Sequence, residues 1–93
     1  MIAAFGDHET ETIWEGRRSR RLPTDIQAVS LRKLRLLNNA RVLSDLRVPP
    51  GNRLEALGGI RHGQHSIRIN DQWRICFVWR DGNAHQVEIV DYH

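Results

Sequence analysis

Side chains that transfer protons gather at the C-terminal end of the chain, where the stretch VEIV runs into Asp91, Tyr92 and His93. A carboxylate, a phenol and an imidazole can orient, donate and accept protons, the imidazole near neutral pH. VEIV alternates in the manner of a strand, so we expect this ending to be docked on a sheet rather than frayed like most chain ends. The last three residues are therefore a candidate site.

Arg74 is the second candidate, because it is a cation inside the apolar stretch WRICFVW. A partly desolvated guanidinium needs an anionic partner. The residues leave two interpretations open: an internal ion pair with Asp91 or Glu88, or a site for a phosphate. Strand alternation predicts that Arg74 shares a face with Cys76, and that Tyr92 lies near the Arg74 end of the sheet.

Glu55 completes a set that can act on RNA. With Arg74 and the C-terminal residues it offers a base, an acid, a cation for developing negative charge and an aromatic face for a nucleobase. The sequence contains no Gly-rich phosphate loop, no spaced metal ligands and no nucleophile with a partner base. RNA cleavage without a metal ion fits these residues, because the ribose 2′-OH supplies the attacking oxygen and the protein only moves protons and stabilises charge.

Length and composition limit the number of domains and the kinds of partner that the protein can have. The 93 residues suffice for one domain, and thirteen of the fourteen cations are Arg, with a net charge of +3. An Arg-rich surface favours nucleic acid or an acidic protein partner, although a GC-rich genome gives the same bias. The single Cys76 excludes an internal disulfide and is expected to be a small buried apolar residue. Neither a run of ~20 apolar residues nor a signal peptide is present, so we expect a cytoplasmic protein.

The elements that position these residues are predicted as helices first and strands after. MIAAF is an opening strand, and Asp7 caps a helix that Gly16 ends. The basic connection RRSRRLP is expected to be a solvated turn in preference to a dedicated RNA clamp. Thr24 with Gln27 forms a capping box for a longer helix through residue 39. We expect the cations of that helix to face outward: Arg32, Lys33 and Arg35. After residue 51 the apolar residues recur at every second position, which predicts strands. Hairpin turns are expected at Asn-Asp (70–71) and Asp-Gly (81–82).

The segments PPGNRLEALGGIRHGQHSIRINDQWRICFVW and VEIVDYH closely resemble the HigB family, also called plasmid maintenance killer proteins, within the RelE and ParE toxin superfamily. The resemblance covers nearly the whole chain. It implies an α+β fold in which two N-terminal helices pack on a twisted, mainly antiparallel sheet, as one RelE/ParE-like domain over residues 1–93. It further implies the toxin of a type II toxin–antitoxin system, a metal-free, ribosome-dependent endoribonuclease that cuts translated mRNA through 2′-OH attack.

The same resemblance assigns site residues and partners. It places phosphate contact and catalysis on five positions: Glu55, Arg74, Asp91, Tyr92 and His93. Glu55 stands where some members carry His, and Gly58 where many carry Lys, so phosphate binding would rest also on Arg61 and Arg68. No cofactor is implied. The expected partners are a HigA-type antitoxin, the 70S ribosome and mRNA, with no membrane; the free toxin would be monomeric and would form a hetero-oligomer with its antitoxin.

Two other functions remain compatible with the fold. ParE-like relatives share it and act by binding DNA gyrase instead of cutting RNA, so the fold alone does not choose between them. A relative that binds its antitoxin without any activity is the third possibility. The residues Asp91, Tyr92 and His93 favour the nuclease.

Overall fold

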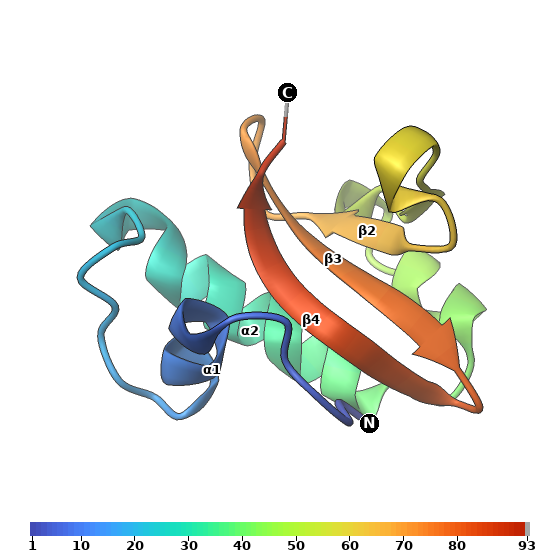
Figure 1. Cartoon of the computed structure of the whole chain (residues 1–93), viewed down its shortest axis with the longest axis horizontal. Helices are drawn as coiled ribbons and strands as arrows, with labels where there is room; N and C mark the ends of the chain where they lie inside the picture. Colours follow the sequence, from blue (N-terminus) through green and yellow to red (C-terminus); the bar gives the residue numbers. More distant parts are fainter. Residues whose placement is uncertain (93) are drawn as a thin grey trace.

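The structure, a computed structural model, describes residues 1–92. Its helices are α1 (His8–Trp14) and α2 (Thr24–Asn39), and its strands are β1 (Glu55–Ala56), β2 (His65–Arg68), β3 (Trp73–Arg80) and β4 (Asn83–Asp91). Short 3₁₀ turns occupy η1 (Leu43–Arg47), η2 (Pro50–Asn52) and η3 (Gly59–Arg61). Over the described residues the strands form one antiparallel sheet in the order β1-β2-β3-β4 (Figure 1). The predicted α+β fold is confirmed.

The two hairpins form where the turn residues indicated. Asp81 and Gly82 have φ angles of 54° and 77°, which is the type I′ geometry that suits the twist of paired strands. At the other hairpin the Asn70 side chain accepts hydrogen bonds from the backbone N–H groups of Gln72 and Trp73, at 2.9 and 2.8 Å. These turns fix β2, β3 and β4 as consecutive neighbours.

Helix α1 begins and ends as the sequence predicted, whereas the start of α2 differs. Asp7 accepts a hydrogen bond from the Thr10 backbone at 3.1 Å, and Gly16, with φ 81°, follows the helix. Helix α2 begins after Pro23 without a side-chain cap. The predicted capping box of Thr24 and Gln27 is therefore wrong, because the Gln27 side chain bonds to the linker that precedes the helix instead.

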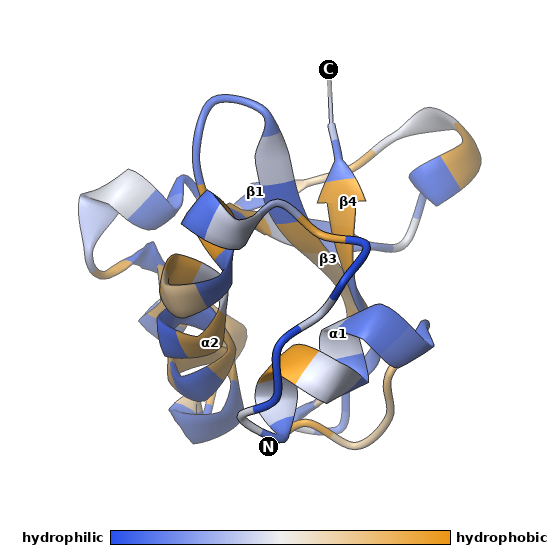
Figure 2. Ribbon diagram, turned by 90° about the vertical axis from the view of Figure 1, so that its left-hand side faces the viewer, coloured by the Kyte–Doolittle hydropathy of each residue, from blue (hydrophilic) through white to orange (hydrophobic). Residues whose placement is uncertain are grey.

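The core lies between the helices and one face of the sheet. Residues of α2 with helical spacing are buried there, together with aliphatic and aromatic residues of the strands: Ile26, Leu34, Leu37, Ile67, Ile75, Phe77 and Val87. Hydrophobic colour gathers on the inward side of α2 and on β3 and β4 in Figure 2. Burial of each such side chain is worth about 1.5–3 kcal/mol relative to exposure.

Lys33 departs from the expected outward orientation. It is buried, and its ammonium donates a hydrogen bond to the Asn52 side chain, which in turn donates to the Leu46 carbonyl at 3.1 Å. Burial lowers the pKa of Lys33, and the nearby charges of Arg32 and Arg68 lower it further. The prediction of a solvated Lys33 is wrong because this ammonium ties α2 to the chain around η2.

The outer edge of β4 is covered by the beginning of the chain. The predicted opening strand takes the form of two isolated parallel bridges, Ile2 to Ala84 and Phe5 to Val87. Farther along, the hydroxyl of Thr10 in α1 accepts a hydrogen bond from the backbone N–H of Ile89 at 2.8 Å. Covering an exposed edge blocks pairing with other chains and fixes the strand in place. The last strand is therefore held from both sides.

Candidate active site

Three of the candidate site residues, Glu55, Arg68 and Arg74, lie on the sheet face opposite the helices. Directly paired residues of an antiparallel sheet lie on the same face. The register therefore defines two adjacent rows across the sheet, Glu55–Ser66–Cys76–Glu88 and Arg68–Arg74–Val90. Ile75 and Phe77 alternate with them and point into the core. The strand face of Arg74 is thus separate from the face that packs on α2.

Arg74 is held by contacts from two other strands. Its Nη1 lies 3.0 Å from Oε1 of Glu55, and it donates a hydrogen bond to Oγ of Ser66 at 2.8 Å. The Arg74 side chain is 14% exposed, whereas that of Glu55 is 45% exposed. The predicted internal partners, Asp91 and Glu88, are wrong: the anion beside Arg74 is Glu55. An ion pair of this kind orients the guanidinium while leaving the carboxylate open to solvent.

Tyr92 lies beside the same guanidinium, as predicted. Its ring centroid is 5.5 Å from the Arg74 guanidinium carbon, within the range of a cation–π contact. The backbone N–H of Tyr92 donates to the Gln72 carbonyl at 2.7 Å, which continues the pairing of the last strand past its end. The prediction that this end is docked on the sheet is confirmed as far as Tyr92.

The structure does not bring every predicted residue onto this face. Asp91 pairs with Trp73, so its register position belongs to the opposite face, and its Oδ2 accepts a hydrogen bond from the Gln72 side chain at 3.0 Å. Arg68 lies opposite Arg74 on β2 and forms an ion pair with Asp71 in the turn. His93 lies outside the described residues.

A second ion pair closes the other side of the site. Arg61 of η3 reaches Glu88 of β4 at 2.7 Å and also donates to the Gln64 side chain at 3.0 Å. The hydrogen bond to Glu88 raises the pKa of Arg61. This contact holds η3 against β4.

Ser66, Cys76 and Glu88 lie between these cations on the same sheet face. Ser66 was not among the predicted site residues; its only signal in the sequence is a hydroxyl on the polar side of an alternating strand. Glu88 was predicted only as a partner for Arg74. Cys76 is fully buried, as predicted, and burial raises the pKa of its thiol. Among residues 1–92, no group of three or more His, Cys, Asp or Glu side chains is arranged to hold a metal ion.

No helix within the described part of the chain is both long enough and apolar enough to cross a membrane.

Comparison with known proteins identifies the family of this fold. The family model described as the RelE-like toxin of type II toxin–antitoxin system HigB matches residues 3–93. Toxin HigB-1 of Vibrio cholerae serotype O1 is 45% identical over 85 residues, which cover 90% of each chain. An uncharacterized protein of Haemophilus influenzae is 30% identical over 67 residues, covering 72% of this chain and 66% of its own. With its two helices packed on an antiparallel sheet, the chain belongs to the HigB-like family of RelE-like toxins.

Proposed function

We propose that this toxin is a ribosome-dependent endoribonuclease that cuts translated mRNA without a metal ion or other cofactor. The observation that carries the proposal is the position of Arg74, between the Glu55 carboxylate and the Tyr92 ring. A cation, a carboxylate and an exposed aromatic ring are the groups that a phosphodiester, a ribose hydroxyl and a nucleobase require.

The reaction needs no protein nucleophile. The ribose 2′-oxygen attacks the adjacent phosphorus, the bond from phosphorus to the 5′-oxygen breaks, and the products are a 2′,3′-cyclic phosphate and a 5′-hydroxyl. Glu55 accepts the proton of the 2′-OH, and a proton is delivered to the departing 5′-oxygen. Arg74 stabilises the negative charge that develops on the phosphate oxygens. Substrate phosphate would compete with Glu55 for Arg74, which frees the carboxylate to act as base.

The remaining predicted residues have supporting roles in this proposal. Tyr92 stacks on a base next to the cleaved bond. His93 follows it directly and is the proposed proton donor to the leaving oxygen, since an imidazole titrates near neutral pH. Asp91 orients this end of the chain through its contact with Gln72. Arg61 and Arg68 contribute positive charge along the path of the RNA backbone.

We infer the dependence on the ribosome from the small number of acid and base groups at the site. The Arg74 face carries few acid and base groups, and one 3₁₀ turn spans it near Glu88. In-line attack requires the 2′-oxygen, the phosphorus and the leaving oxygen to be aligned, and alignment supplies much of the rate. We therefore assign that alignment to the 70S ribosome, which holds the mRNA in an extended path.

We propose the same partners and cellular setting that the sequence resemblance implies. A HigA-type antitoxin neutralises the toxin by forming a hetero-oligomer with it, and the free toxin is a monomer. The protein acts in the cytoplasm, where translated mRNA is available.

Primer extension on an mRNA that is being translated by purified ribosomes tests this function. The wild-type protein should produce discrete cuts in the translated mRNA, and the same mRNA without ribosomes should remain essentially intact. Efficient cutting of naked RNA would contradict the ribosome dependence. Growth arrest with uncut mRNA and trapped DNA gyrase would instead support the ParE-like function, and absence of any arrest would support an inactive antitoxin-binding protein.

A further inference from the structure

The basic linker between the two helices has an ordered backbone, in contrast to the solvated turn that its composition suggested. Ser19 is 3% exposed, its hydroxyl donates to Glu9 at 2.6 Å, and the same oxygen accepts from the N–H groups of Arg21 and Leu22, at 3.2 Å each. The Gln27 side chain accepts from the Ser19 N–H at 3.0 Å and donates to the Ser19 carbonyl at 2.8 Å. The linker is therefore fixed against both helices.

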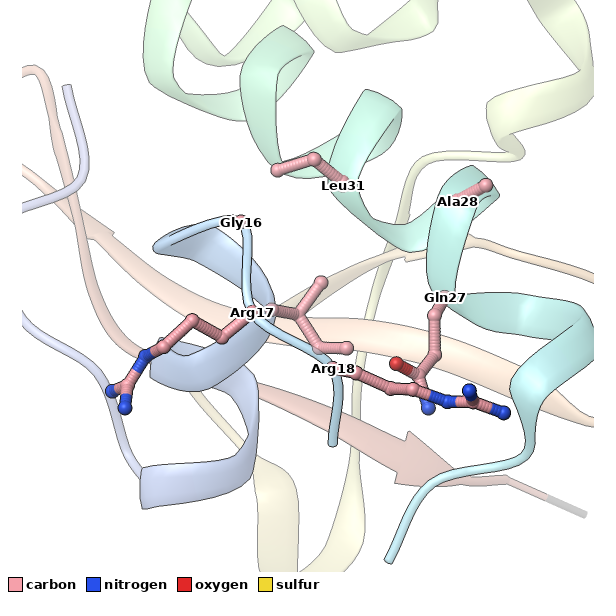
Figure 3. Close-up of a pocket in the computed structure, with 7 residues that line it drawn as sticks. Gly16, Arg17, Arg18, Gln27, Ala28 and Leu31 are labelled. Atoms are coloured by element: carbon pink, nitrogen blue, oxygen red, sulfur yellow. The ribbon is translucent and has the colours of Figure 1, made fainter. Parts of the chain in front are cut away.

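This fixed linker borders a groove between α1 and α2. The groove has a volume of about 210 Å³ and is lined by Ile13, Gly16, Arg17, Arg18, Gln27, Ala28 and Leu31. Figure 3 shows Arg17 and Arg18 extending from the linker, with Leu31 and Ala28 on the α2 side. Aliphatic side chains thus provide the floor of the groove and two guanidinium groups its rim. Since hydrogen bonds already hold the linker, a ligand would meet a largely preformed site.

The charge of the groove favours an acidic ligand. Arg17 forms an ion pair with Glu15, and Arg18 donates to the Thr24 hydroxyl at 3.3 Å, so Arg18 keeps an uncompensated charge. Arg20 and Arg21 are exposed on the same linker and form no salt bridge within residues 1–92. Like charges crowded on a short segment raise the local potential and attract an oppositely charged partner.

We propose that this groove docks a segment of the antitoxin that carries aliphatic side chains flanked by Asp or Glu. The inference rests on the antitoxin partner that membership in this toxin family implies. An aliphatic floor favours a protein over RNA, because single-stranded RNA binds to basic surfaces chiefly through its phosphates and through bases stacked on aromatic rings. Among the lining residues no aromatic ring is present. The groove lining also includes none of Glu55, Arg74 and Tyr92, so the antitoxin segment would bind away from the catalytic face.

Three toxin variants test the groove by measuring affinity for the purified cognate antitoxin in calorimetric titrations. The double variant Arg17→Glu/Arg18→Glu reverses the rim charge, and Ala28→Trp fills the groove without changing charge. The matched control is Arg32→Glu/Arg35→Glu, which makes the same charge change on exposed positions of α2 outside the groove. Each of the first two should weaken antitoxin binding about tenfold or more, as expected for central interface residues, and the control should stay within about twofold.

Thermal unfolding of each variant verifies that it is folded before the affinities are compared. Wild-type antitoxin affinity in both the charge-reversed and the filled variant would overturn the proposal. So would a charge-reversed variant that binds antitoxin normally but no longer cuts mRNA on ribosomes, since that result would assign the groove to ribosomal RNA. The titrations measure binding alone, so their outcome does not depend on whether the toxin is a nuclease.

Discussion

Arg74 and Glu55 meet at 3.0 Å although their strands are not neighbours in the sheet, since β2 lies between β3 and β1. Ser66 occupies the intervening position on β2, paired with both Glu55 and Cys76, and accepts a hydrogen bond from Arg74 at 2.8 Å. A small residue at this point allows the two long side chains to meet above it. The ion pair therefore depends on the register of three strands and on the size of one side chain.

Replacing Arg74 with Lys should lower the cleavage rate by about 10²-fold or more while the protein stays folded. Lysine retains the charge but loses the planar fork that matches a phosphate. Single-turnover cleavage on programmed ribosomes measures the rate, and thermal unfolding measures stability. If Arg74→Lys leaves no folded protein, Arg74 is a structural member of the ion pair with Glu55 and its catalytic role is wrong.

Replacing Glu55 with Gln should reduce cleavage by about 10²- to 10⁴-fold, the usual contribution of a general base. The free energy of unfolding should fall by about 1 kcal/mol or less, because the carboxylate is half exposed and such ion pairs are weak. Glu55→His should restore part of the activity by supplying another base. Glu11→Gln, on an exposed position of α1, is the control and should cut normally. Full activity of Glu55→Gln would move the base elsewhere.

Two substitutions of Tyr92 distinguish base stacking by its ring from proton transfer by its hydroxyl. Tyr92→Ala removes the ring above Arg74 and should weaken transition-state stabilisation by about 1–3 kcal/mol, the value of one base stacked on an aromatic ring. Tyr92→Phe keeps the ring and should remain close to wild type. Cleavage rates of the two variants on the same mRNA measure the difference. Equal loss in both would show that the hydroxyl, and not the ring, carries the function.

Asp45 should make stability depend on pH in the acid range. Its carboxylate accepts hydrogen bonds from the N–H groups of Arg41 and Val42 at 2.9 and 3.2 Å, which lower its pKa below the ordinary value of 3.8. The contribution to stability is then fully present above pH about 3.8 and is lost as pH falls through the folded-state pKa. Urea unfolding should find Asp45→Asn less stable than wild type at pH 7, with the difference shrinking below pH 3.8. A difference that is constant with pH would contradict this origin.

Local signals in the sequence predicted most of the fold. The Asp7 cap, the Asp-Gly turn and the alternation of β3 each depend on residues close in the chain, and each is confirmed. The capping box failed because Ser19, outside the helix, competes for the Gln27 side chain. The composition of a helix start does not reveal such a competitor.

The clear alternation of β3 and β4 did not predict the partner of Arg74. The neighbouring β4 offers Glu88 and Asp91, and both were natural candidates. A bulge between Cys76 and Val78, where Gln86 has φ 52°, resets the register of β4. It leaves Glu88 opposite Cys76 and within reach of Arg61. Glu55 comes from a two-residue strand, and periodicity over two residues cannot fix a register.

The bridges between the beginning of the chain and β4 have a consequence for the order of folding. Contacts between positions so far apart in sequence close a long loop, which costs conformational entropy. Residues 83–92 are also synthesised after every element with which they pair, including the segment around Ile2 and Phe5. Until these residues are made, Arg74 therefore lacks its contact with Tyr92, and the segment around Ile2 and Phe5 lacks its pairing with β4. The toxin acquires its complete surface only after the ribosome that made it has finished these residues, which separates in time the synthesis of the molecule from its action.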